Sequence, residues 1–436
     1  MNKNPSRKSR LTSSRFRIVS ILFAAIYFTC AAQVWSFDES IPAACPIPRS
    51  TDIAAITITP LHRTYEGSAD TWYPVWAGNG NCYSPFMDGL GADGNWEAKT
   101  PAHPKLGFAC ISGDDPMKLV LKKTSVIEET ADYAPGPLGR YGCTVLPYKG
   151  VLYYGSSYRL IVNNHHFLRP FAGFNISTDG GIHWTRRSGA LFPEAEYPDI
   201  KIGEPHFVDF GQEMKYSPDG KAYLVAFGAD ARLAANRPKQ TLAPTLPLEN
   251  PDWNWADCVY LLRVTHSPET INDASKYEFY AGNDANGKPV WTRDFLRIKP
   301  VVEWADHMGQ VAVTYVPPLK KYIMCVTDGS NYGGPFNAYF LESSELTGPW
   351  RMVTYWGAFG KQAYQVHIPS HFIGTTVKNG SLTAWICYAA NFNSSQVDPP
   401  DSKYAMCLRE ITINVPAEAA GKHTSPQDTS TPPVPR

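Results

Sequence analysis

The chain has 436 residues, of which 43% are hydrophobic and 13% aromatic, with 40 basic and 40 acidic side chains. This is enough apolar material for a large core and too little charge for a disordered protein. Six of the basic residues precede the first acidic one, Asp38, so residues 37–436 contain 34 basic against 40 acidic side chains. A mildly acidic chain without a basic run binds phosphate backbones poorly, so we expect no nucleic-acid partner.

The first 36 residues have the order of a secretory signal. Six positive charges lead into an apolar stretch of 15 residues, Ile18 to Ala32, and small residues suited to cleavage follow. The stretch is shorter than the roughly 20 residues that span a bilayer as a helix. We therefore expect residues 1–36 to be removed, the protein to be secreted or periplasmic, and no stable membrane insertion after removal.

Eight cysteines remain once Cys30 is removed with the signal. An even number in an exported chain predicts at least one disulfide, although eight thiols allow 105 pairings. The alternative is that several are buried free thiols, because Cys258, Cys325 and Cys387 lie in apolar runs. The chain contains no CxxC, HExxH or Cys/His cluster, so we expect neither a metal nor a cofactor.

Short β-rich runs separated by turn residues dominate the chain, and helical periodicity is nearly absent. The expected strands are Val151–Tyr154, Tyr158–Val162, His206–Phe210, Ala222–Phe227, Cys258–Val264, Val311–Val316, Tyr322–Thr327, Ala338–Glu342, Leu382–Tyr388 and Tyr404–Val415. Between them, 33 Gly and 37 Pro mark many turns. This pattern predicts an all-β protein with closed, repeated sheets, as in a propeller. We expect the propeller over residues 37–415 and a disordered tail over 416–436.

One segment supports the propeller directly. Residues 177–184, Ser-Thr-Asp-Gly-Gly-Ile-His-Trp, have the S-x-D-x-G-x-x-W spacing of an Asp-box. Asp179 can accept hydrogen bonds from backbone NH groups, the glycines supply positive φ, and Trp184 can fix the hairpin to its blade. Asp-boxes occur mainly in propellers, and we interpret Asp179 as a structural residue.

The segment 70–89, DTWYPVWAGNGNCYSPFMDG, resembles the opening blade of the DUF4185 family. Weaker matches follow in order at 113–116, 277–282, 289–291, 314–315, 321–322 and 348–350. The resemblance implies a five-bladed β-propeller and, with less force, a glycoside hydrolase, because members with a known activity degrade D-arabinan. It also implies that Asp70 and Asp88 are the catalytic pair.

The spacing of these two acids gives a separate argument. They flank Gly78-Asn79-Gly80, which suits a three-residue hairpin loop with Gly80 in the left-handed region. If Ala77 pairs with Asn81, Asp70 stands opposite Asp88, and their repulsion would raise the pKa of one carboxyl. A two-residue loop or a bulge at Pro74 or Pro85 would shift that register, and both acids could instead be ordinary strand-end and turn residues.

Other polar and aromatic side chains are candidates for substrate binding. They are Trp72, Trp76, Glu204, His206, His307, Tyr364, Gln365 and His367, and Trp253, Trp255 and Trp304 also offer faces for sugar stacking. For each of them a structural role is the more frequent one. His165 and His166 point to opposite faces of a strand and are not expected to act together.

The favoured function is therefore a secreted glycoside hydrolase that acts on a polysaccharide or oligosaccharide, with arabinan-type furanosides first. One alternative is a non-catalytic carbohydrate-binding propeller. Another is a sialidase-like hydrolase, which would need an arginine cluster and a Tyr–Glu pair. We expect a monomer.

Overall fold

The computed structural model describes residues 35, 37–91, 106–127, 138–162, 165–187, 189–193, 200–234, 241–243, 246–247, 252–329, 334–391 and 398–416. The expected signal, apart from Trp35, and the expected tail beyond Pro416 lie outside the described residues. In the described part, no helix has the length and apolar character needed to cross a bilayer.

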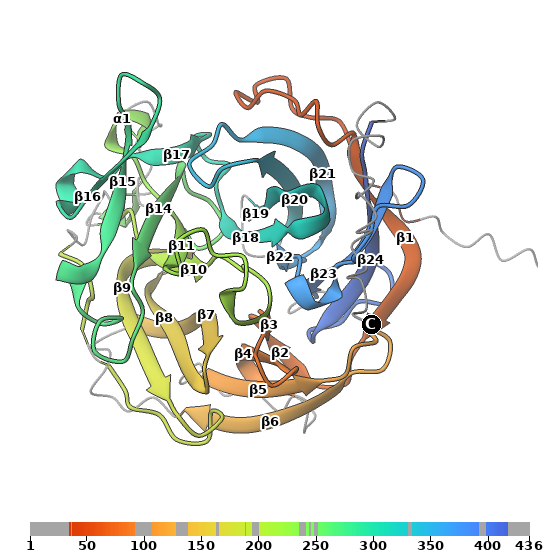
Figure 1. Cartoon of the computed structure of the whole chain (residues 1–436), viewed down its shortest axis with the longest axis horizontal. Helices are drawn as coiled ribbons and strands as arrows, with labels where there is room; N and C mark the ends of the chain where they lie inside the picture. Colours follow the sequence, from red (N-terminus) through yellow and green to blue (C-terminus); the bar gives the residue numbers. More distant parts are fainter. Residues whose placement is uncertain are drawn as a thin grey trace, which may run out of the picture. The chain divides into compact units, whose positions relative to one another are not determined.

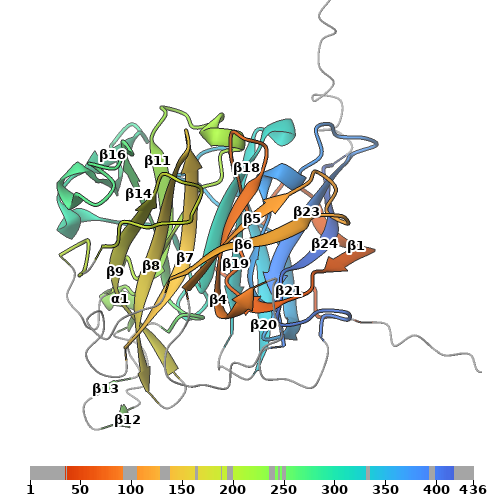
Figure 2. The same cartoon turned by 90° about the horizontal axis from the view of Figure 1, so that it is seen from below.

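Five antiparallel sheets surround a central axis as the blades of a propeller (Figure 1). The first blade contains β2 (Ser68–Asp70), β3 (Val75–Trp76), β4 (Cys82–Gly91), β5 (Leu106–Ser112) and β6 (Val120–Ile127). The second contains β7 (Leu138–Tyr148), β8 (Val151–Val162) and β9 (His165–Ser177), which lie side by side in Figure 2.

The remaining blades follow in chain order. The third contains β10 (Glu204–Phe207), β11 (Ala222–Gly228), β14 (Cys258–Val264), β15 (Glu278–Asn283), β16 (Pro289–Thr292) and β17 (Pro300–Glu303). The fourth contains β18 (Gln310–Val316), β19 (Lys321–Asp328), β20 (Pro335–Ser343) and β21 (Arg351–Lys361). The fifth contains β22 (Tyr364–His367), β23 (Ser381–Ala389), β24 (Cys407–Asn414) and β1 (Ala55–Thr64).

Helices are few and short in the described residues. They are α1 (Ala231–Ala234) and the 3₁₀ turns η2 (Gln212–Met214), η3 (Ala274–Lys276), η4 (Phe295–Arg297), η5 (Pro317–Leu319) and η6 (Ser370–Phe372). A separate two-stranded ribbon is formed by β12 (Thr241–Ala243) and β13 (Leu246–Pro247).

The two ends of the propeller meet in one sheet. Strand β1 pairs antiparallel with β24, from Ala55 opposite Asn414 to Thr64 opposite Cys407, and Figure 1 shows the red-orange strand beside the blue one. This pairing closes the ring, because a strand from the start of the chain completes the sheet formed by the end of the chain. The predicted five-bladed propeller is confirmed.

Burial explains which strands the sequence pattern found most accurately. All seven residues of β11 are buried, as are six of the seven in β14, and their near-continuous apolar runs reflect burial on both faces. Several strand ends, in β10, β20 and β24, differ from the prediction by two or three residues, and one pair of expected strands is joined. The expected strands at Val151–Tyr154 and Tyr158–Val162 are a single strand, β8, which continues through Gly155 with shifts in its pairing to β9.

The Asp-box forms the predicted turn. The Oδ1 atom of Asp179 accepts hydrogen bonds from the backbone NH groups of Ile182 at 3.1 Å and His183 at 3.0 Å. These bonds and the His183 side chain hold the pKa of Asp179 below its ordinary value. The Trp184 ring packs edge-on against Phe108 of the first blade, 4.9 Å away. The Asp-box therefore has a structural role, because it connects the second blade to the first.

The predicted disulfide is absent. All eight cysteines after Cys30 are free thiols: Cys45, Cys82, Cys110, Cys143, Cys258, Cys325, Cys387 and Cys407. The sheet register gives a reason. Cys82 and Cys110 lie on the paired strands β4 and β5 one position out of register, so their side chains point to opposite faces, and the same holds for Cys387 and Cys407 on β23 and β24. The alternative of buried free thiols describes the structure better.

We expect eight thiols per chain to react with a thiol reagent in denatured, unreduced protein that begins at Phe37. The free cysteines and the faces they occupy support this number. Chemically reduced protein is the control and should give the same count. A count of six or fewer without reduction would contradict the structure.

Candidate active site

The hairpin between the two candidate acids has the predicted three-residue loop. The backbone NH of Ala77 donates to the carbonyl of Asn81 at 2.9 Å, and that of Gly80 donates to the carbonyl of Ala77 at 3.1 Å. Gly80 has a φ of 87°, which a residue with a side chain adopts at a cost. The turn therefore fixes the register of β3 against β4.

Farther from the turn, the predicted register is wrong by one residue. Asp70 pairs with Met87 rather than with Asp88, and the next pair, Ser68 with Gly91, contains a further shift. The reason is that residues 71–74, which include Pro74, leave the ladder between β2 and β3.

Irregular backbone nevertheless brings both acids to one place. Asp88 has a φ of 50° and Thr71 a φ of 59°, both in the left-handed region, and such strained positions are often found at functional sites. Gly89 permits the close approach of β2, because a Cβ atom there would lie 1.8 Å from the carbonyl oxygen of Ser68. The irregular pairing of β2 with β4, and not a regular ladder, therefore sets the orientation of Asp88.

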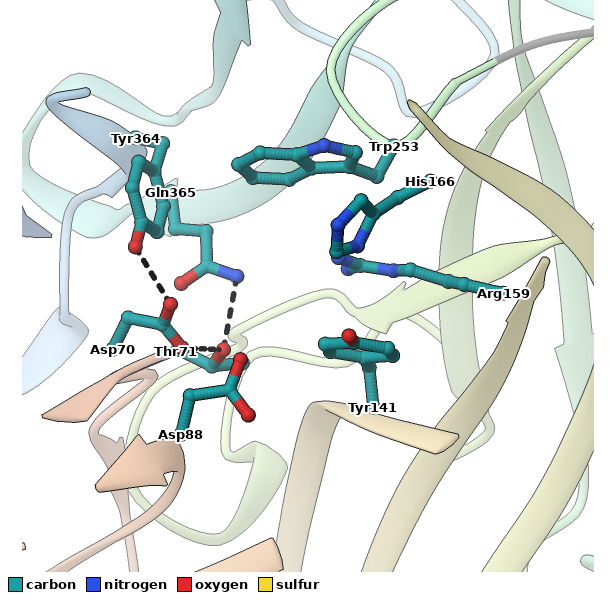
Figure 3. Close-up of a pocket in the computed structure, with 9 residues that line it drawn as sticks. All are labelled: Asp70, Thr71, Asp88, Tyr141, Arg159, His166, Trp253, Tyr364 and Gln365. Carbon is teal, nitrogen blue, oxygen red and sulfur yellow. Dashed lines mark hydrogen bonds between the residues drawn. The ribbon is translucent and has the colours of Figure 1, made fainter. Parts of the chain in front are cut away.

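The two acids line a pocket between the blades (Figure 3). Its lining consists of Asp70, Thr71, Asp88, Tyr141, Arg159, His166, Trp253, Tyr364 and Gln365. The space among them is about 340 Å³ when the part open to solvent is included, but only about 20 Å³ admits the centre of a water molecule. The narrow part thus has room for about one water, and a sugar would have to enter from the open side.

Three hydroxyl groups surround the carboxyl of Asp70. Tyr364 and Tyr404 donate to Oδ2 at 2.6 and 2.9 Å, and Thr71 donates to Oδ1 at 2.8 Å. Burial raises the pKa of Asp70, while these hydrogen bonds oppose the rise because they stabilise the charged form. Asp70 is therefore the acid of the pair whose ionised form is stabilised by hydrogen bonds from neighbouring hydroxyl groups.

Asp88 holds its proton more firmly. Burial and then the charge of Asp70 raise the pKa of Asp88 to about 8, and the nearby Arg159 offsets part of this rise. Asp88 is consequently protonated at neutral pH. Two carboxyls in different environments within one pocket can serve as an acid and a base.

Arg159, which is held in a buried ion pair, forms part of the opposite wall. The Nη2 atom of Arg159 donates to Oε2 of Glu204 at 2.5 Å, and both side chains are almost fully buried. The guanidinium carbon of Arg159 lies 4.3 Å from the ring centre of Tyr141 and 5.2 Å from that of Trp253. Figure 3 shows it between these two rings, reaching toward the carboxyls.

Of the predicted binding residues, Trp253, Tyr364 and Gln365 line the pocket with the two acids. Glu204 is behind Arg159 and does not line it. His206 lies tilted against the ring of Tyr73 at 4.6 Å, and His367 stacks on the same ring at 4.5 Å, both in the buried interior. Burial lowers the pKa of His367 to about 4.

The other three predicted residues lie elsewhere. Trp72 is a core residue, stacked on Phe86 at 5.3 Å. Trp76 stacks on His371 and lines a second, smaller pocket. His307 is paired with Asp328 at 2.9 Å. None of the three lines the pocket that holds the acids.

Sequence reasoning missed four lining residues, namely Thr71, Tyr141, Arg159 and His166. Three of them come from the second blade, on strands β7, β8 and β9. Arg159 is the only Arg or Lys in the described lining, and it is paired, so the arginine cluster required by a sialidase-like site is not found there.

One group in the described residues has the ligand spacing of a cation site. Oxygen and sulfur atoms of Asp230, Cys258 and Glu303 lie within 4.8 Å of one another. Arg232 donates to Asp230 at 2.8 Å and to Glu303 at 2.5 Å. Its guanidinium thus already neutralises the carboxylates that a cation would use.

No family model and no curated protein matches the chain. Its resemblance to the DUF4185 family therefore stays a prediction. Solved structures do match. The RS223 β-xylosidase is 13% identical, with a TM-score of 0.44, over 81% of this chain and 94% of that one. A GH43_1 enzyme from Xanthomonas citri is 12% identical, with a TM-score of 0.39, over 85% and 92%.

A further match is CoXyl43, a GH43 β-xylosidase/α-arabinofuranosidase from a compost microbial metagenome. It is 13% identical, with a TM-score of 0.39, over 85% of this chain and 97% of that one. The chain thus has a distant structural similarity to GH43 glycoside hydrolases, at the level of the fold.

Proposed function

We propose that the protein is an exported glycoside hydrolase that cleaves a polysaccharide or oligosaccharide, with arabinan-type furanosides as the first candidates. The observation that carries the proposal is the pair of carboxyls, Asp70 and Asp88, in one pocket: the pKa of Asp88 is raised to about 8, and three hydroxyl groups donate hydrogen bonds that support the ionised form of Asp70. Glycoside hydrolysis requires such a pair.

In this proposal Asp88 is the general acid. It gives its proton to the glycosidic oxygen while the bond from that oxygen to the anomeric carbon breaks. Asp70, ionised and held by Tyr364, Tyr404 and Thr71, takes the proton of the attacking water or attacks the anomeric carbon itself. Water then supplies the hydroxyl of the new reducing end.

The test is sugar release from purified protein incubated with arabinans, xylans and other plant, microbial and mycobacterial polysaccharides. Release of oligosaccharides or monosaccharides from at least one of them is the expected result. Folded protein that binds a polysaccharide but releases no sugar would instead support the carbohydrate-binding alternative.

We expect hydrolysis to fall as the pH rises through about 8. Asp88 must be protonated to act as the acid, and burial together with the Asp70 charge raises its pKa to about 8. Below that pH the acid is present, and above it kcat/KM should fall about tenfold per pH unit. The measurement is kcat/KM between pH 4 and 10, with circular dichroism as the control for folding. A constant rate from pH 7 to 10 would exclude Asp88 as the acid.

A further inference from the structure

His307 is an accessible histidine whose ring is held in one orientation. Its side chain is 35% exposed, and its Nδ1 atom lies 2.9 Å from Oδ2 of Asp328, whose side chain is almost fully buried. The ring also stacks on Trp304, with 4.1 Å between the ring centres. Because the carboxylate engages Nδ1, the nitrogen that stays open to solvent is Nε2.

The residues around Asp328 keep this orientation fixed. Its Oδ1 atom accepts from the amide of Asn337 at 2.6 Å, and the oxygen of that amide accepts from the backbone NH of Ala358 at 2.8 Å. The hydroxyl of Tyr339 donates to the carbonyl of His307. Burial of a carboxylate is unfavourable, and it raises the pKa of Asp328. In return, the buried carboxylate orients one accessible imidazole, an arrangement typical of functional side chains.

This pair lies at the same end of the propeller as the pocket of the two acids. Gln310 begins β18 and pairs with Thr327, the neighbour of Asp328. The side chain of Gln310 accepts from the backbone NH of Gln365, a lining residue, at 2.8 Å. Figure 1 shows β22, the strand of Gln365, beside β18 and β19. Three positions separate His307 from Gln310, so their Cα atoms are at most about 11 Å apart.

An aromatic contact connects the two places as well. Phe336 precedes Asn337, and its ring centre lies 5.8 Å from that of Trp253 and 5.7 Å from that of Tyr364, both of which line the pocket. His307 is therefore outside the lining but close to it. The narrow part of the pocket has room for about one water, so the units of a glycan beyond the cleaved bond must lie outside that part.

The accessible nitrogen is suited to a sugar hydroxyl. With its Nδ1–H group directed to the carboxylate, the neutral ring of His307 carries a lone pair on Nε2 and accepts a hydrogen bond there. A sugar hydroxyl donates such a bond. The stack on Trp304 keeps the plane of the ring, and with it the direction of that lone pair, in place.

We propose that His307, oriented by Asp328 and Trp304, is a distal subsite that binds a hydroxyl of a sugar unit remote from the bond that is cleaved. This inference rests on the proposed function and deepens it. It makes His307 a residue that selects for chain length, because a short fragment held at the two acids does not reach it.

The experiment compares kcat/KM for arabinan and xylan oligosaccharides of increasing length. His307→Phe keeps an aromatic ring against Trp304 and removes the accepting nitrogen. We expect the ratio of kcat/KM for the longest fragment to that for the shortest cleaved fragment to fall roughly three- to tenfold, as for the loss of one hydrogen bond to a neutral group. His307→Gln, whose amide oxygen accepts a hydrogen bond, should keep more of this ratio than His307→Phe.

The matched control is His183→Phe. His183 is also an accessible histidine paired with a carboxylate, that of Asp179 at 2.7 Å, but it follows the end of β9 opposite to His166 of the lining. This variant should leave the ratio unchanged. If His307→Phe does not fold because Asp328 loses its partner, the double variant with Asp328→Asn removes the buried charge and takes its place.

An unchanged ratio in the folded His307 variant would overturn the inference and leave the hydrolase proposal standing. The same oligosaccharides are therefore also tested by calorimetry for binding. If none is cleaved, but affinity rises with length in the wild type and this rise is lost in His307→Phe, the subsite stands and the hydrolase is wrong. If the folded protein neither binds nor cleaves any fragment, both are wrong.

Discussion

Asp88→Asn and Asp70→Asn are each expected to lower kcat by about 10²–10⁴, the range for loss of general acid–base catalysis. Asn has the shape of Asp but neither gives nor takes a proton at neutral pH. Removal of the acid should also change the pH profile. The fall near pH 8 belongs to Asp88, so in Asp88→Asn the remaining activity should no longer show it.

The matched control is Asp114→Asn, at an aspartate whose side chain is 94% exposed and which is outside the pocket. It should hydrolyse substrate like the wild type. Far-ultraviolet circular dichroism and the melting temperature of all three variants show whether each is folded. Either acid whose folded Asn variant keeps near-normal turnover is not part of the mechanism.

Glu204→Ala should destabilise the protein by about 3–5 kcal/mol, because it leaves the guanidinium of Arg159 buried without its counterion. Replacement of both members, Arg159→Met with Glu204→Met, should recover much of this loss, since no charge then remains buried. The measurement is the free energy of unfolding from denaturant titrations.

An exposed ion pair of the same length provides the control. Arg232 donates to Glu303 at 2.5 Å, but these side chains are 65% and 41% exposed. Glu303→Ala should therefore cost at most about 1 kcal/mol, because water solvates the charge that remains. Equal losses for Glu204→Ala and Glu303→Ala would show that the buried pair has no special importance for stability.

The local chemistry of the hairpin was readable from the sequence. Gly78-Asn79-Gly80 specifies its three-residue turn, and the Asp-box specifies the contacts of Asp179, because both depend on residues a few positions apart. The strand partner of Asp70 could not be predicted from the sequence. Counting residues outward from the turn gives the right partner only if the hydrogen-bonded ladder is unbroken. The ladder breaks at residues 71–74, and the conformation of Asp88 depends on how β2 packs against Gly89.

Contributions from distant blades were the least predictable part of the pocket. Arg159 lies 71 positions from Asp88 in a strand with no motif, and its role depends on Glu204 of another blade. The sequence likewise could not show whether Cys82 bonds to Cys110 or Cys387 to Cys407. The register of the paired strands decides which face of the sheet each side chain points to.

The sequence by itself determined the all-β class, the repeated turns, the Asp-box and the three-residue turn between Asp70 and Asp88. These follow from residue type and short spacing, which act through turn chemistry and strand alternation. Only the tertiary structure decided the register of the acids, the free state of the thiols and the wall formed by Arg159. Each of these depends on which strands become neighbours when the ring closes, and closure joins residues that are far apart in the chain.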